Sequence, residues 1–76
     1  MQTLADFVKE KRKEAHLTQT EFAQKAGVAL TVVRKIEQGK QNLNLSAVNQ
    51  VLKMFGHTLA PVSLREIQAN ENKEES

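Results

Sequence analysis

Residues 18–40 carry the strongest structural signal in the chain, and they read TQTEFAQKAGVALTVVRKIEQGK. Thr18 and Glu21 have the spacing of a capping box, in which the hydroxyl and the carboxylate each bond a backbone N–H group at the start of a helix. Gly27 follows about two turns later, and glycine most readily adopts the left-handed conformation that ends many helices. We therefore expect a short helix here whose inward side chains are Phe22, Ala23 and Ala26.

A second short helix should cover roughly Leu30 to Gln38 and end at Gly39. Val33 and Ile36 are three positions apart, so they share one face of this helix and should point inward. Two short helices joined by a tight turn, after a longer helix, are the pattern of a helix-turn-helix.

The chain before this stretch predicts a helix from Thr3 to about His16. Thr3 is a suitable N-cap, and an apolar stripe follows it at Leu4, Phe7, Val8 and Ala15. Histidine is enriched among residues that adopt the left-handed conformation, so we expect His16 to end the helix and not to act as a ligand.

A fourth helix should begin after the N-cap Asn44 and end at Gly56. Its core stripe has the i, i+3, i+4, i+7 spacing and consists of Val48, Val51, Leu52 and Phe55.

Residues 58–64 (TLAPVSL) form a short segment of β-like composition. Pro61 lacks an N–H donor, so the segment is expected to form only an edge strand. An isolated edge strand leaves its backbone groups unpaired, and a twin strand across a two-fold axis would pair them. We therefore expect a dimerisation strand whose buried side chains are Leu59, Val62 and Leu64. The alternative is that residues 57–76 form a flexible tail and the domain dimerises only on DNA or through the fourth helix.

Length and composition argue against a membrane protein, an enzyme and a metal-binding protein. The 76 residues are enough for one domain, and they include no cysteine and only two histidines, His16 and His57. No apolar run approaches the ~18 residues of a membrane span. We expect a cytoplasmic, non-enzymatic protein with no cofactor and no metal site. Residues 1–64 carry a net charge of +4 and residues 65–76 one of −2, which is compatible with nucleic-acid binding.

The central stretch also resembles the XRE/Cro–repressor family of bacterial and phage DNA-binding domains. The resemblance covers about residues 4–56 and rests on Gln19, Phe22-Ala23, Ala26-Gly27-Val28, Val33 and Ile36-Glu37-x-Gly39-Lys40. The short segment after the fourth helix further resembles HipB-like antitoxins, in which a C-terminal strand pairs with its twin.

The resemblance implies that the helix at 30–38 lies in the major groove of DNA. Its base-contacting residues would be Leu30, Thr31, Val32, Arg34 and Lys35. Phosphate contacts would come from Gln19, Arg12, Lys40, Gln41 and Asn42. Arg12 also matches a family pair with Glu37, and that pair either orients the helices or adds a phosphate contact.

Two positions depart from the family pattern. Ala29 stands where the family usually has a Ser-like cap, and loss of such a cap costs ~1 kcal/mol, so the following helix should begin less firmly. Leu30 and Val32 replace a glutamine pair, so no operator sequence is transferred from the family.

We thus expect an all-α, four-helix, lambda-repressor-like helix-turn-helix domain over residues 1–56, with a C-terminal β-strand at 57–64 that pairs across a homodimer, and a mostly disordered acidic tail at 65–76. The expected function is a dimeric transcriptional repressor of an inverted-repeat operator, most like a HipB-like antitoxin that autoregulates its promoter. Two alternatives stay open: an antitoxin that mainly neutralises a HipA-like kinase toxin, and a stand-alone phage-type repressor.

Overall fold

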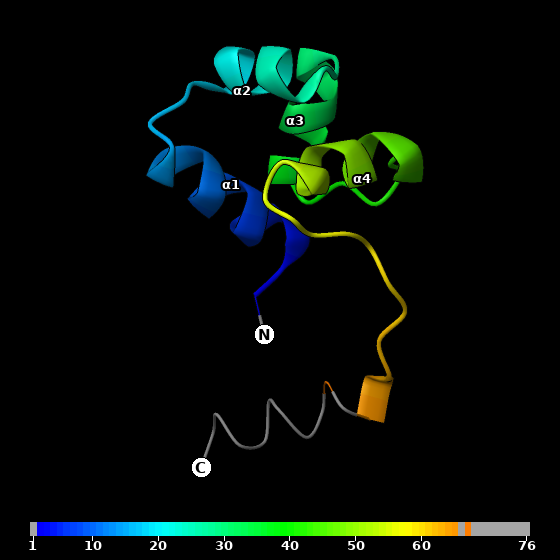
Figure 1. Ribbon diagram of the computed structural model, residues 1–76. Coiled ribbons are helices and arrows are strands. Elements are labelled where there is room, and N and C mark those ends of the chain that lie inside the picture. Colours follow the sequence, from blue (N-terminus) through cyan, green and yellow to red (C-terminus); the bar gives the residue numbers. More distant parts are fainter. Residues whose placement is uncertain (1, 66, 68–76) are drawn as a thin grey trace.

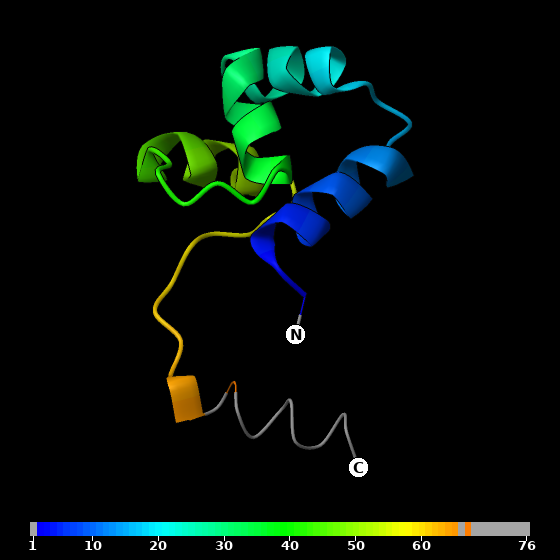
Figure 2. The same ribbon diagram turned by 180° about the vertical axis from the view of Figure 1, so that it is seen from behind.

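The computed structural model describes residues 2–65 and 67, which form four helices and no β-strand (Figure 1). Their order is α1 (Leu4–Glu14), α2 (Gln19–Ala26), α3 (Leu30–Glu37) and α4 (Leu45–Lys53). The expected all-α class and the four helices are confirmed for this part of the chain. Figure 2 shows the same arrangement from behind, with α3 between α2 and α4.

Three of the four helices begin with a side chain that caps the backbone. Thr3 Oγ1 accepts a hydrogen bond from the N–H of Asp6 at 3.1 Å, and Asn44 Oδ1 accepts one from Ala47 at 3.1 Å. Thr18 and Glu21 form the predicted capping box, with distances of 3.1 and 2.9 Å. The N-cap of α3 is Ala29. Its methyl side chain cannot accept a hydrogen bond, so the first turn of α3 has no side-chain cap.

A residue in the left-handed backbone conformation follows each of the first two helices, as the sequence predicts. His16 has a φ of 58° and follows α1, while Gly27 has a φ of 73° and follows α2. Both turns therefore depend on residue types that tolerate this conformation.

The core lies where the helices meet. Its buried members come from every helix: Val8, Phe22, Ala23, Ala26, Val33, Ile36, Val48, Val51 and Leu52. Leu4, Phe7 and Phe55 pack against this core. The expectation for Ala15 is wrong, because α1 ends at Glu14 and Ala15, its C-cap, is exposed.

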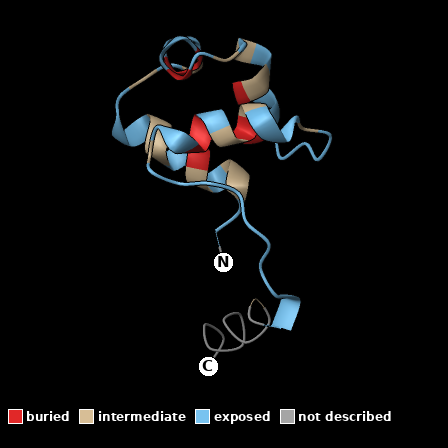
Figure 3. Cartoon of the chain, turned by 45° about the vertical axis from the view of Figure 1, so that its right-hand side comes forward, coloured by how far each residue is buried: buried red, intermediate tan, exposed pale blue. Residues whose placement is uncertain are grey.

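The segment after α4 first lies against α1 and α4, where the His57 and Phe7 rings are 4.7 Å apart, and then leaves the helices. Residues 56–65 are all exposed (Figure 3). Asn49 Oδ1 holds its start by accepting hydrogen bonds from the N–H of Leu59 at 2.8 Å and the hydroxyl of Thr58 at 3.1 Å. Residues 57–63 have neither helical nor strand structure, so the predicted strand does not form within the single chain.

Leu64 departs from the expected extended segment. It begins a short helical stretch with Arg65 and Ile67, because Ser63 accepts hydrogen bonds from both, through Oγ to Arg65 at 3.2 Å and through its carbonyl to Ile67 at 3.2 Å. The predicted disordered tail, apart from Arg65 and Ile67, lies outside the described residues.

Candidate nucleic-acid interface

The turn between α2 and α3 is short and presents α3 at the surface. α2 ends at Ala26, and α3 begins at Leu30 after Gly27, Val28 and Ala29. Val33, Ile36 and Glu37 are the buried residues of α3, so the opposite side of the helix faces outward.

The five predicted base-contacting residues of α3 fall into two groups. Thr31, Arg34 and Lys35 are exposed, whereas Leu30 and Val32 are half-buried and pack against the core. The outward face of α3 is therefore polar and basic. Its two apolar candidates present only part of their side chains.

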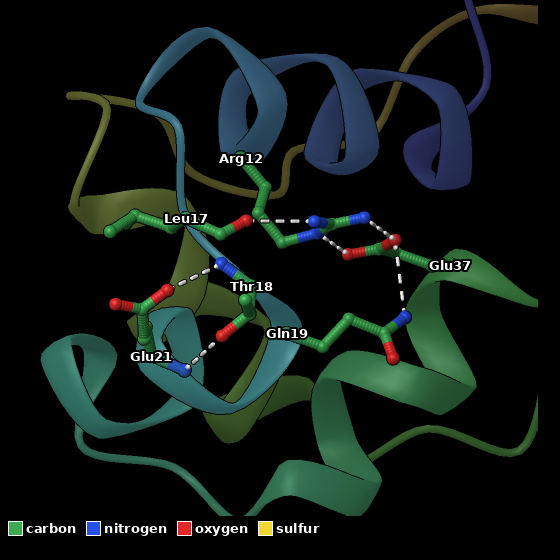
Figure 4. A network of polar contacts seen from close by, with 6 residues as sticks. All are labelled: Arg12, Leu17, Thr18, Gln19, Glu21 and Glu37. Atoms are coloured by element: carbon green, nitrogen blue, oxygen red, sulfur yellow. Dashed lines mark hydrogen bonds and ion pairs between the residues drawn. The ribbon is translucent and has the colours of Figure 1, made fainter.

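Arg12 of α1 forms a two-point ion pair with Glu37 at the end of α3 (Figure 4). Its Nε donates to Oε2 at 2.8 Å and its Nη2 to Oε1 at 3.0 Å, while Nη1 donates to the carbonyl of Leu17 at 2.8 Å. The side chains are 14% and 3% exposed. One guanidinium thus joins α1, the linker before α2 and α3, a geometry that the fork of arginine permits and lysine does not.

Gln19, the first residue of α2, joins the same cluster. Its Nε2 donates to Glu37 Oε1 at 3.3 Å (Figure 4). A side-chain amide carries two N–H donors, and one of them is directed at this carboxylate. The structure therefore brings together three residues that the sequence singled out: Arg12, Gln19 and Glu37.

The charged pair changes the pKa values of both partners. Burial raises the pKa of the Glu37 carboxyl, but hydrogen bonds from Arg12 and Gln19 and the nearby positive charge of Arg12 lower it, and the net pKa lies below its ordinary value. The hydrogen bond to Glu37 raises the pKa of Arg12. The Glu37 side chain is therefore ionised at neutral pH.

The loop after α3 carries the remaining predicted phosphate contacts. Lys40, Gln41 and Asn42 are all exposed, directly after Gly39. The N–H of Lys40 bonds the carbonyl of Lys35 at 3.1 Å, so the loop starts at a fixed position relative to α3.

Comparisons with known proteins agree with this geometry. A family model described as helix-turn-helix matches residues 8–61, which is most of the chain. The chain belongs to the helix-turn-helix family. It is also 32% identical over 68 residues to the "ImmF control region 10 kDa protein" of Bacillus phage phi105, and the alignment covers 90% of this chain and 76% of that protein.

Membership confirms the XRE/Cro-type resemblance and identifies the chain as a DNA-binding transcriptional regulator. In helix-turn-helix proteins the second helix of the motif enters the major groove, and here that helix is α3. The finer likeness to HipB-like antitoxins stays a prediction.

Gln38 is a surface residue of this helix-turn-helix protein that the sequence reasoning missed. It is exposed and lies three and four positions after Lys35 and Arg34, on the same face as Thr31. Positions 31, 34, 35 and 38 have the spacing of one helix face, and this spacing in the sequence could have identified Gln38.

Residues 2–65 and 67 contain no group of three or more side chains able to hold a metal ion, and His16 serves as the predicted helix-ending residue. Over the same residues, no helix is both long and apolar enough to cross a bilayer.

Proposed function

We propose that this protein is a homodimeric, sequence-specific transcriptional repressor whose α3 binds the major groove of an inverted-repeat operator. The exposed polar face of α3, formed by Thr31, Arg34 and Lys35, carries the proposal. Lys35 donates to guanine O6 and N7, Thr31 bonds a base or packs on a thymine methyl, and Arg34 contacts a base or a phosphate. Leu30 and Val32 offer their exposed edges to thymine methyl groups.

Phosphate contacts would come from the residues that flank this helix. Lys40, Gln41 and Asn42 of the loop after α3 are exposed, and the amide of Gln19 lies at the first residue of α2. Such contacts set affinity and register and carry no sequence preference. Arg12 already directs three nitrogen atoms at Glu37 and Leu17, which favours its structural role over a phosphate contact.

The regulatory setting is proposed in two forms. The first is a HipB-like antitoxin of the cytoplasm that autoregulates its operon, with a HipA-like kinase toxin as protein partner; the exposed apolar residues after α4 favour a protein partner. The second is a stand-alone phage-type repressor, and the similarity to a phage control-region protein favours it. An adjacent kinase-like reading frame in the genome would support the first form, and its absence the second.

Selection from a random duplex library tests the DNA-binding proposal. Wild-type protein should recover an inverted repeat. Lys35→Ala should recover a different preferred site, at a cost of ~1–3 kcal/mol on the original site. An unchanged preferred site for Lys35→Ala would contradict the assignment of α3 as the base-contacting helix.

Salt titrations separate phosphate contacts from base contacts. Lys40→Ala should weaken binding to all duplexes similarly and flatten the plot of log K against log salt by about 0.9. Lys53→Ala removes the same charge at the end of α4, outside the proposed interface, and should leave that slope unchanged.

A further inference from the structure

The carboxyl end of α2 is bonded by a side chain from a distant helix. The last carbonyl groups of a helix have no partner within it. At this end the N–H of Val28 bonds the carbonyl of Ala23 at 3.1 Å. None of the described backbone N–H groups bonds the carbonyls of Ala26 and Gly27. Gln50 of α4 bonds both through Nε2, at 2.8 Å to Ala26 and 3.0 Å to Gly27.

The amide of Gln50 lies directly against the turn. A Cβ atom added at Gly27 would lie 2.9 Å from Gln50 Nε2, so the glycine both adopts its positive φ of 73° and leaves space for this amide. α3 begins three residues later, and its N-cap Ala29 makes no side-chain bond. The first turn of α3 therefore lacks the side-chain N-cap hydrogen bond that α1, α2 and α4 have.

We infer that Gln50 is a positioning residue for DNA recognition, which fixes the turn between α2 and α3 and through it the placement of α3. Gln50 acts through the carbonyls of Ala26 and Gly27, which it ties to α4. The inference rests on the proposed role of α3 in contacting bases.

Three variants isolate this contact. Gln50→Met keeps an unbranched chain of similar length and removes the donor. Gln50→Lys keeps a donor and places a positive charge at the carboxyl end of α2, where the helix dipole favours it. Gln24→Met makes the same chemical change at an exposed position of α2 whose side chain hydrogen-bonds to none of the described residues.

Amide hydrogen exchange tests the hold on the turn without DNA. The N–H groups of Val28 and Val32 bond Ala23 and Ala29 on the two sides of the turn. Both should exchange about tenfold faster in Gln50→Met, since loss of ~1.4 kcal/mol is a factor of ten. Gln50→Lys and Gln24→Met should exchange as wild type does, and so should the buried Val8 of α1 in every variant. Wild-type exchange at Val28 and Val32 in Gln50→Met overturns the inference.

Binding measurements then test the link to recognition, using a duplex recovered by wild-type protein and a scrambled duplex. Gln50→Met should bind the recovered duplex about tenfold more weakly and the scrambled duplex unchanged, with the same salt slope. A purely structural defect would weaken both duplexes equally and would overturn the role in recognition. If wild-type protein selects no DNA sequence, both the proposed function and the role of Gln50 in recognition are wrong. Amide hydrogen exchange still decides in that case whether Gln50 fixes the turn between α2 and α3.

Discussion

Glu37 is the one buried charged residue among residues 2–65 and 67, and it sits at the junction of three segments. A buried carboxylate is costly unless it is paired and hydrogen-bonded. Arg12 and Gln19 supply three hydrogen bonds to it, which is why a charged group occurs in so small a core. The same contacts make the stability of the domain depend on pH.

We expect wild-type protein to lose stability in acid more steeply than Glu37→Gln. The folded-state pKa of Glu37 lies below its ordinary value of 4.5, so its contribution is complete above that value and is lost as the pH falls through the folded pKa. Glu37→Gln should cost about 2 kcal/mol at neutral pH and less in acid. Urea unfolding at several pH values between about 3 and 7 measures the difference.

A matched variant controls this experiment. Glu14→Gln removes a carboxylate whose side chain is 56% exposed, and exposed ion pairs contribute ~0–1 kcal/mol. If its acid profile departs from wild type as much as that of Glu37→Gln, the Arg12–Glu37 pair is not the source of the pH dependence.

His16 permits a second prediction at this scale. It is exposed and has a φ of 58°, a conformation that costs a residue with a Cβ atom roughly 1–2 kcal/mol. His16→Gly should therefore be neutral or stabilising by up to about 1 kcal/mol, and His16→Val should be destabilising because it is β-branched. Thermal melts with and without zinc provide the measurement. A clear loss of stability in the glycine variant, or a rise with zinc in wild type alone, would refute the helix-ending role.

At the scale of elements, α3 differs from α1, α2 and α4 because its N-cap makes no side-chain hydrogen bond. Ala29 already has the extended backbone of an N-cap, with φ −68° and ψ 148°. Ala29→Ser should therefore raise the free energy of unfolding by about 1 kcal/mol without rearrangement. Asn44→Ala should lower it by a similar amount, because it removes the bond to Ala47. Equal stability of Ala29→Ser and wild type in urea titrations would show that α3 gains nothing from a cap.

The elements also show what can be predicted from the sequence. Thr18, Gly27 and Asn44 act through neighbours three or four residues away, so capping and turn rules locate them. The bond from Gln50 to Ala26 spans 24 residues, and the half-burial of Leu30 and Val32 depends on which helices cover α3. Such features require the packed arrangement. The exception is the Arg12–Glu37 pair, whose members are 25 residues apart and which the family pattern predicts.

At the scale of the whole molecule, exposed apolar side chains occur at the start of α4 and along the segment that follows it. Leu45 lies at the start of α4, and Leu59, Val62 and Leu64 follow in the segment that leaves the helices. Leu45 and Leu59 line one shallow hollow together with Ala60 and Pro61, and exposed apolar residues that lie together are typical of an interaction site. We therefore retain residues 57–64 as the proposed dimer contact, with Leu64 in a helical turn and not in a strand.

A two-fold axis through this contact would place two α3 helices about 34 Å apart, and the operator would then be an inverted repeat.

Leu64 is 74% exposed in the single chain, so Leu64→Asp should leave the fold intact. Loss of a buried leucine costs ~1.5–3 kcal/mol, so dimer dissociation should become at least about tenfold easier. Sedimentation equilibrium measures this, and binding to one half-site should persist. Ser63→Asp adds the same charge beside it and keeps an oxygen able to accept from Arg65. If the two variants remain equally dimeric, or if Leu64→Asp binds the inverted repeat as tightly as wild type, residues 57–64 do not form the dimer contact.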